Sequence, residues 1–428
     1  MSPTTPADPA RPRIDWRPLF LAFWVTSLVE NMGLSQLFAL LPTLLREMGV
    51  PDAQRVPFVG LFVSLMFLLG LPLVPLWGVW ADKYSRKAVI ARSALVEAVV
   101  FAVAALAREP WHVALALLLI GFQLGNTGVM LAGIRDVAPR VRLATIIAAF
   151  GASGPLGMAL GPVLAGVLID GVGWSIAMVF GLSSALSVMT AALVAFATTE
   201  VRPSVIPQGR VVALAFGAVR SVVGDPLVRR LFLIYGVVFL ANQVSRPYMP
   251  LLVEELVGAG PGLASAIGLV MGVASLMGAL AAPFAGYVAD RIGFRPVLLA
   301  ALVAGGCTSL LIPLAPAVGI LALTALVFGA SVATVGAMVI SLLATEVPAE
   351  RRSATLNLVY LPLYIAGIIG PTIGAAVASA GGAGAPYIVG GLVFLTGAAI
   401  VGLRRASTAG TSSAPAPGQE ATPERTAP

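Results

Sequence analysis

Long apolar segments separated by short polar ones occupy most of this chain. Reading the apolar runs between charges and Pro/Gly punctuation predicts twelve helices. They cover residues 17–45, 56–80, 88–107, 111–134, 143–169, 173–197, 230–256, 262–288, 296–315, 317–345, 353–379 and 384–403. A helix of roughly 20 apolar residues spans the hydrocarbon core of a bilayer, where lipid offers no partner to unpaired backbone groups. The pattern therefore predicts an all-α membrane protein with twelve transmembrane helices.

The composition agrees with this prediction. Of the 428 residues, 58% are hydrophobic and 11% are charged, and the mean hydropathy is +0.97. Water cannot solvate that much apolar surface, so a soluble domain is excluded. The single cysteine, Cys307, rules out an internal disulfide. The two ends, 1–16 and 406–428, resemble neither a signal peptide nor a core segment, and we expect disordered tails.

The positive charge is distributed unevenly about the predicted helices. An even number of helices places both termini on one side, and 22 of the 26 Lys and Arg residues fall on that side. This bias predicts that both termini are cytoplasmic. The basic balance then reflects topology and contact with anionic lipid headgroups, and no nucleic-acid partner is expected. Only two basic residues are Lys, which we interpret as the coding bias of a bacterial source, and hence a bacterial plasma membrane.

The chain repeats itself with a spacing of about 208 residues. "GVWADKYSRK" at 78–87 matches "GYVADRIGFR" at 286–295, and "LPTLLREMG" at 41–49 matches "MPLLVEELV" at 249–257. Further on, "GMALGP" at 157–162 matches "AGIIGP" at 366–371. Duplicated helical halves are a transporter architecture.

The repeat predicts two pseudo-symmetric halves of six helices each, residues 17–197 and 230–405. They are joined by a cytoplasmic linker, 198–229. The linker contains "RVVALAFGAVRSVVG", whose arginines flank apolar residues, and an amphipathic helix at the membrane interface is expected there.

The repeated charged segment resembles motif A of the major facilitator superfamily in letters and in position. The resemblance covers residues 17–405 and implies that family's fold. A Gly permits close approach of two helices, and an Asp at a helix end can meet a basic side chain. The resemblance implies a gate on the cytoplasmic side, in which Arg135 is the expected partner of Asp82. The gate residues are Gly78, Asp82, Lys83, Arg86, Lys87, Arg135, Gly286, Asp290 and Arg291.

Two further motifs of that family bear on the direction and coupling of transport. "GMALGPVLAG" resembles motif C, which is associated with antiporters, although Ala165 replaces a usual Gly. Pro removes a helix hydrogen bond and Gly admits close packing, so a hinge is expected. The hinge residues are Gly157, Gly161, Pro162 and Gly166, with Gly370 and Pro371 in the repeat. The arginine of motif B is absent, because Leu117 occupies its position.

Two carboxyl groups lie deep inside predicted helices, well away from the helix ends. Ionisable groups at such depth are costly and mark functional sites. Glu30 lies about 13 residues, or roughly 20 Å, into the first helix, and it is the first candidate for binding a proton or cation. An ion pair between Glu30 and Arg246 is the structural alternative. Glu97 is the second candidate, although a peripheral position and a structural bond to Arg92 are equally compatible with its sequence context.

Several polar side chains are expected to face a central cavity. Any one of them can equally join two helices. The predicted cavity residues are Asn31, Gln36, Gln123, Asn126, Gln243, Arg246, Asn357 and Tyr360. Few polar groups among many apolar ones suit amphipathic substrates better than sugars.

Other functions fit the sequence less well. "GASG" at 151–154 matches an intramembrane serine protease pattern, but the only histidine, His112, is predicted at the opposite depth to Ser153. A receptor or scaffold needs neither repeated gates nor repeated hinges. The sequence therefore predicts a secondary transporter that exports drugs or other amphipathic small molecules against protons. Proton-coupled uptake or efflux of a sugar or another metabolite is the alternative. We expect no enzyme activity, no cofactor, no metal and a functional monomer.

Overall fold

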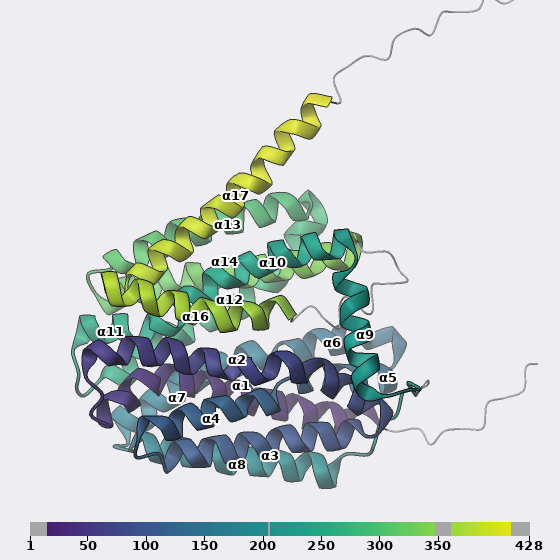
Figure 1. Cartoon of the computed structure of the whole chain (residues 1–428), viewed down its shortest axis with the longest axis horizontal. Coiled ribbons are helices and arrows are strands. Elements are labelled where there is room, and N and C mark those ends of the chain that lie inside the picture. Colours follow the sequence, from purple (N-terminus) through teal and green to yellow (C-terminus); the bar gives the residue numbers. More distant parts are fainter. Residues whose placement is uncertain (1–14, 204–205, 347–360, 412–428) are drawn as a thin grey trace, which may run out of the picture.

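The computed structural model describes residues 15–203, 206–346 and 361–411. Every regular element in these ranges is helical (Figure 1). The first part of the chain forms α1 (Trp16–Glu47), α2 (Asp52–Lys83), α3 (Arg86–Ala105), α4 (Pro110–Gln123), α5 (Asn126–Val137), η1 (Arg140–Arg142), α6 (Leu143–Gly151), α7 (Ser153–Gly166), η2 (Val167–Gly171) and α8 (Ile176–Ala197). The second part forms α9 (Val211–Val223), α10 (Pro226–Ser245), η3 (Arg246–Tyr248), α11 (Met249–Val257), α12 (Leu263–Ile292), α13 (Phe294–Leu311), η4 (Ile312–Leu314), α14 (Val318–Glu346), α16 (Leu361–Gly381) and α17 (Ala385–Thr411).

Eleven helices in the described ranges are long and apolar enough to cross a membrane. The remaining predicted span, 230–256, is present as α10 and α11 with the 3-10 turn η3 between them. Pro247 and Pro250 lie at this break, and proline cannot donate a helix hydrogen bond. The all-α membrane fold predicted from the sequence is confirmed.

Several predicted helices are subdivided. The span predicted at 111–134 consists of α4 and α5, which are separated at Gly125. Gly125 has a φ of 99°, a left-handed conformation that suits glycine because it lacks a Cβ. The span predicted at 143–169 likewise consists of α6, α7 and the π-helical turn η2.

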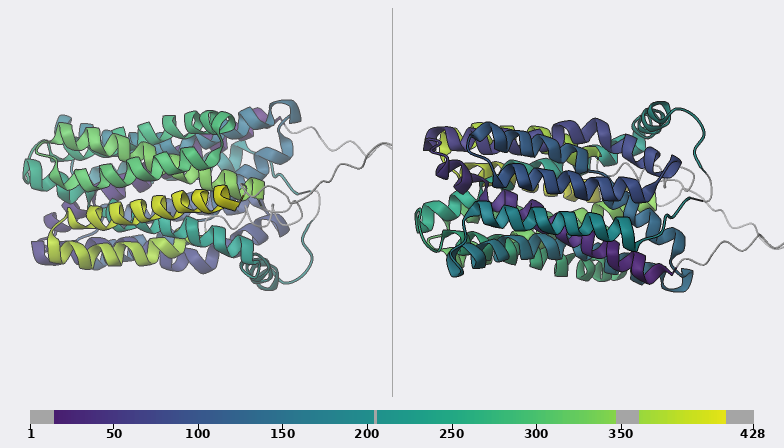
Figure 2. Two further views of the ribbon diagram at one scale, coloured as in Figure 1. Left: turned by 90° about the horizontal axis from the view of Figure 1, so that it is seen from above. Right: turned by 90° about the horizontal axis from the view of Figure 1, so that it is seen from below.

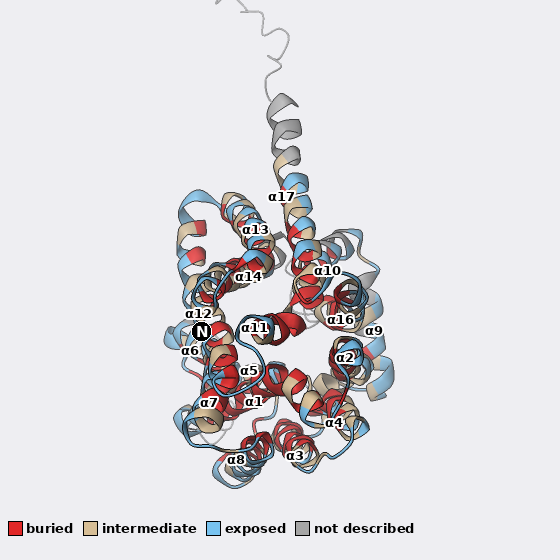
Figure 3. Ribbon diagram, turned by 90° about the vertical axis from the view of Figure 1, so that its left-hand side faces the viewer, coloured by how far each residue is buried: buried red, intermediate tan, exposed pale blue. Residues whose placement is uncertain are grey.

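Buried and exposed side chains occupy different parts of the helical bundle. Buried residues lie mainly between the helices, and exposed residues mainly on the perimeter (Figure 3). Phe196 and Phe284 are among many large apolar side chains that remain exposed. A perimeter of this kind is suited to contact with lipid tails.

Within each half, a glycine-rich helix packs directly on the first helix of that half. A Cβ on Gly161 of α7 would lie 2.2 Å from the Ser35 hydroxyl oxygen of α1. A Cβ on Gly370 of α16 would lie 2.6 Å from the Cβ of Gln243 on α10. Ser35 and Gln243 are 208 residues apart, so the sequence repeat corresponds to a repeated contact.

The same repetition occurs between the halves. A Cβ on Gly60 of α2 would lie 2.4 Å from the Pro371 carbonyl oxygen on α16. A Cβ on Gly268 of α12, again 208 residues later, would lie 2.5 Å from the Pro162 carbonyl oxygen on α7. Two equivalent glycine-to-carbonyl contacts therefore join the halves.

The helix α9 lies across one end of the bundle and is seen end on in Figure 2. The opposite end, on the left in Figure 1, is called the outer end below, because the charge distribution predicts that it faces outward. At the outer end, Glu254 of α11 accepts hydrogen bonds from Arg46 of α1 at 2.8 Å and from Arg55 of α2 at 2.7 Å. These ion pairs join the two halves.

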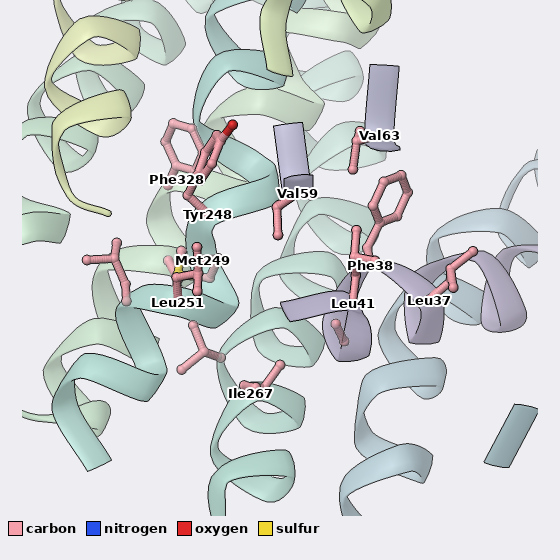
Figure 4. Close-up of a cluster of buried hydrophobic side chains, with 14 of the residues drawn as sticks. Leu37, Phe38, Leu41, Val59, Val63, Tyr248, Met249, Leu251, Ile267 and Phe328 are labelled. Atoms are coloured by element: carbon pink, nitrogen blue, oxygen red, sulfur yellow. The ribbon is translucent and has the colours of Figure 1, made fainter. Parts of the chain in front are cut away.

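A second carboxylate also joins the halves at the outer end. Asp170 of η2 accepts hydrogen bonds from the backbone N–H groups of Gly262, at 3.0 Å, and Ser265, at 2.6 Å. These are orphan donors at the start of α12, so Asp170 caps a helix of the other half. Apolar side chains fill the space between the halves nearby, among them Leu41, Val59 and Tyr248 (Figure 4). The outer end is closed.

Replacing Gly60 by leucine is expected to open the outer end. The new side chain cannot fit against the Pro371 carbonyl, and overpacking costs about 1–3 kcal/mol, enough to shift a two-state equilibrium. In a Cys307→Ser background, spin labels at Ala53→Cys and Ala259→Cys will report longer distances by double electron–electron resonance. Gly181→Leu is the matched control, because no atom lies within 4 Å of that Cβ position. An unchanged distance in Gly60→Leu would contradict this account.

Candidate functional site

Glu30 lies on α1, is buried, and contacts a neighbouring helix. The Asn126 side-chain amide donates a hydrogen bond to its carboxylate. Asn126 is the first residue of α5, directly after the left-handed Gly125. The break at Gly125 therefore places a polar first turn of α5 beside Glu30, inside the first half of the molecule.

Glu97, on α3, lies in the same cluster and is only 1% exposed. A Cβ on Gly33 of α1 would lie 3.2 Å from a Glu97 carboxylate oxygen, so the glycine leaves space for this carboxyl group. Glu30 is within electrostatic range. Neither Glu97 oxygen has a hydrogen-bond donor with good geometry in the described part of the chain. The neighbouring Ser187 hydroxyl donates to the Ser183 carbonyl instead, at 2.9 Å.

Arg92 is the cation nearest to this pair. Its guanidinium lies 3.5 Å from the Trp77 ring centroid and donates to the Ser93 hydroxyl at 2.8 Å. Its Nε and Nη1 atoms have no partner in the described ranges. Arg92 interacts electrostatically with Glu30. The cluster thus combines two buried carboxyl groups with one guanidinium.

The position of Glu97 corrects one expectation. The sequence allowed a bond to Arg92, but Glu97 points toward α1 and forms no ion pair with Arg92 among the described contacts. Successive turns of α3 direct Arg92 and Glu97 to different neighbours. The alternative pair of Glu30 with Arg246 is also absent from the described ion pairs, because Asn126 and Arg92 are the neighbours of Glu30.

One of the other predicted cavity residues, Gln36, joins two helices. Gln36 accepts a hydrogen bond from Ser183 of α8 at 2.5 Å, and Asn31 donates to the Ser27 carbonyl of its own helix at 2.8 Å. Gln123 and Gln243 are buried. Gln36 therefore points into the first half, which corrects the expectation that it faces a central cavity. The predicted Asn357 and Tyr360 lie outside the described residues.

The motif A residues form a network within the first half. Arg86 donates to Asp82 at 2.8 Å and to Asp136 at 2.7 Å. The expected partner of Asp82, Arg135, is more than half exposed and lies 3.6 Å from Asp136. The described ion pairs do not include the expected Asp82–Arg135 pair, because Arg86, the first residue of α3, is bonded to both Asp82 and Asp136.

A further acidic residue, Glu200, completes this network. Its carboxylate accepts hydrogen bonds from the Ser85 hydroxyl and, at 2.9 Å, from the Arg86 backbone N–H at the start of α3. Lys87 donates to the Thr198 carbonyl at 2.8 Å, and Lys83 donates to the Gly209 carbonyl in the linker. Glu200 is not among the residues predicted from the sequence. The one sequence feature that pointed to it is an acidic residue shortly after the helix predicted at 173–197.

The glycines of motif A and its repeat do not make close contacts. No atom lies within 4 Å of a Cβ position on Gly78 or Gly286, which corrects the expectation of close helix approach there. The halves are held together at the other end of the bundle. In the repeat, Asp290 is exposed, and Arg291 lies over the Tyr287 ring at 4.3 Å.

The motif C residues pack as expected. A Cβ on Gly157 would lie 2.4 Å from the Leu28 carbonyl oxygen of α1, and a Cβ on Gly166 would lie 2.7 Å from the Ser265 Cα of α12. The protease pattern gains no support. Ser153 is hydrogen-bonded to Ser27 and Phe150, and His112 stacks on Trp111 with a centroid distance of 3.9 Å.

Comparison with known proteins adds to this geometry. The Major Facilitator Superfamily model matches residues 19–265 and 231–427. The multidrug resistance protein MdtG of Enterobacter lignolyticus (strain SCF1) is 26% identical over 402 residues, covering 93% of this chain and 95% of that protein. MdtG of Citrobacter koseri (strain ATCC BAA-895 / CDC 4225-83 / SGSC4696) is 28% identical over 301 residues, covering 69% and 72%.

Solved structures share the fold. A bacterial homologue of the human lysosomal transporter Spinster, in an inward-facing and occupied conformation, aligns with a TM-score of 0.73 and 15% identity, covering 96% of this chain and all of that one. The nucleoside transporter NupG aligns with a TM-score of 0.68 and 14% identity, covering 93% and 100%. With the family model matching most of the sequence and the duplicated helical fold present, the chain belongs to the Major Facilitator Superfamily.

Proposed function

We propose that this protein exports amphipathic small molecules, drugs among them, across the bacterial plasma membrane in exchange for protons. The observation that carries the proposal is the cluster of two buried carboxyl groups, Glu30 and Glu97, with the partly buried Arg92. The similarity to MdtG proteins named for multidrug resistance supports the substrate class.

The charge balance of the cluster supports proton binding. Arg92 can balance one carboxylate, and the second has no cation within the described surroundings. An unpaired charge away from water is costly. A single proton shared by Glu30 and Glu97 removes that charge, and its release restores it. The cluster therefore alternates between two electrostatic states, as a coupling site must.

The conformation supports alternating access. Glu254 and Asp170 close the outer end, whereas the described ion pairs at the opposite end stay within the first half. With both termini in the cytoplasm, as the charge distribution predicts, this is the inward-facing state. Export then needs the outer contacts to break while the motif A residues form the cytoplasmic gate and the Gly-Pro helices bend. One chain contains all of these parts, so a functional monomer is sufficient.

Glu30→Gln and Glu97→Gln are each expected to abolish substrate-driven proton movement. Each removes one of the two carboxyl groups, so the cluster stays neutral beside Arg92 without binding a proton. The purified variants will be reconstituted in vesicles that contain a pH dye, with an imposed pH gradient and a panel of amphipathic drugs.

Substrate exchange without a pH gradient is the accompanying control, and it should survive in both variants because the halves can still move. Glu109→Gln, at the residue directly before α4 and outside the cluster, should behave as wild type. Substrate-dependent dissipation of the gradient that persists in both cluster variants would contradict this assignment of the proton site.

Glu254→Gln is expected to favour the outward-facing state. The substitution removes the charge that holds Arg46 and Arg55, and hydrogen bonds to charged groups contribute about 1.5–3 kcal/mol each. Cysteine accessibility or the spin-label distance at the outer end will measure the shift. Glu255→Gln is the matched control, because its exposed side chain forms no ion pair within the described residues. Equal behaviour of the two variants would show that Glu254 does not hold the outer end closed.

A further inference from the structure

Arg246 carries a partly exposed guanidinium between the two halves of the bundle. It occupies the first position of η3, where the span containing α10 and α11 is interrupted. Its guanidinium carbon lies 4.9 Å from the ring centroid of Phe38, on α1 of the other half. The ion pairs found among the described residues do not include Arg246. This arrangement leaves a positive charge between the two halves.

Arg246 lies between the halves, next to the closed outer end. Along the chain, α10 runs from the cytoplasmic end to Ser245, and Arg246 follows at once. Tyr248, two residues further, is fully buried and donates to the Pro371 carbonyl at 2.7 Å. Beyond it, Met249 and Leu251 belong to the same buried apolar cluster as Leu41 and Val59 (Figure 4). This part of the cluster, at the closed outer end, is called the plug below. A molecule entering from the cytoplasm would meet Arg246 just before this plug.

The protein itself supplies little to balance this charge. The Phe38 ring contributes a cation–π interaction, which does not offset the cost of an unpaired charge away from water. Glu30 accepts its hydrogen bond from Asn126, and the described ion pairs contain no Glu30–Arg246 pair. The polar group within electrostatic range is the phenol of Tyr387, on α17. A neutral phenol can donate to an anion but cannot replace one.

We propose that Arg246 binds an anionic group of the substrate, a carboxylate or a group of similar shape, while the apolar body of the substrate packs on Phe38 and the plug. The inference rests on the proposed export of amphipathic compounds and names their charge class. The planar guanidinium offers two parallel donors that match a carboxylate. The aromatic ring beside it supplies apolar contact area, so the site selects amphipathic anions over cations with the same body.

Binding of three probes with one apolar body tests the site. The probes are tritiated 4-(naphthalen-1-yl)butanoate, its neutral methyl ester, and the corresponding trimethylammonium cation. Scintillation proximity with the purified full-length chain will measure their affinities. The butanoate is expected to bind about tenfold or more tightly than the ester, the range that a charge-assisted hydrogen bond provides.

Arg246→Gln should lower butanoate affinity about tenfold or more and leave ester affinity within about twofold, whereas Arg246→Lys should retain part of the preference. Equal loss for all three probes in Arg246→Gln, together with no rescue by lysine, would show a packing role and overturn the proposal. Displacement of butanoate by millimolar chloride would assign the site to a small inorganic anion and overturn it as well.

Two outcomes separate this inference from the proposed function. A wild type that prefers the cationic probe overturns the anion site, while proton-coupled export stands if the pH-dye assay still shows exchange. If the wild type binds the butanoate selectively but moves no protons in that assay, the anion site stands and the proposed coupling fails.

Discussion

An ionised side chain in the interior of an apolar helical bundle must find its opposite charge within the protein or bring it in from outside. This constraint organises the molecule. At the two ends of the bundle the charges are matched inside the chain, by Arg86 with Asp82 and Asp136 and by Glu254 with Arg46 and Arg55. Between the two ends of the bundle, the charged side chains are not matched by ion pairs among the described residues. In the described part of the chain, the first half has one carboxyl group more than Arg92 can balance, and Arg246 in the second half forms no ion pair. These are the sites that we propose for the proton and for the substrate.

Close approach of backbones is the second organising element. Interhelical packing in a membrane relies on small residues, since lipid tails compete equally for apolar contacts. Here glycines on equivalent helices meet equivalent partners: Gly161 and Gly370 inside the halves, Gly60 and Gly268 between them. The contacts between the halves are made with proline carbonyls, in helices that already lack one hydrogen bond. The same residues that give close packing therefore sit where the helices can bend.

The helices, the duplication and the Gly-Pro contacts could be predicted from the sequence, because each depends on residue type at a fixed spacing. The partners of polar side chains could not. Glu97 is directed toward α1 because Gly33 leaves space for it, and Gln36 is held by Ser183 across the bundle. Spacing along one helix does not specify such contacts. Position along the chain likewise did not identify Arg86 as the partner of Asp82, which only the three-dimensional arrangement shows.

Because the chain breaks at Gly125, α5 is a short, separate helix, and each of its ends makes a polar contact with another helix. Asn126, its first residue, holds Glu30, and Asp136, near its last, holds Arg86. Ten residues of helix separate these contacts, roughly 15 Å at 1.5 Å per residue. Because α4 does not continue rigidly into α5, the helix can pivot about the glycine. Loss of the Asn126 contact with Glu30 at one end would then displace the Asp136 carboxylate at the other. A movement of α5 would therefore connect the acidic cluster with the motif A residues.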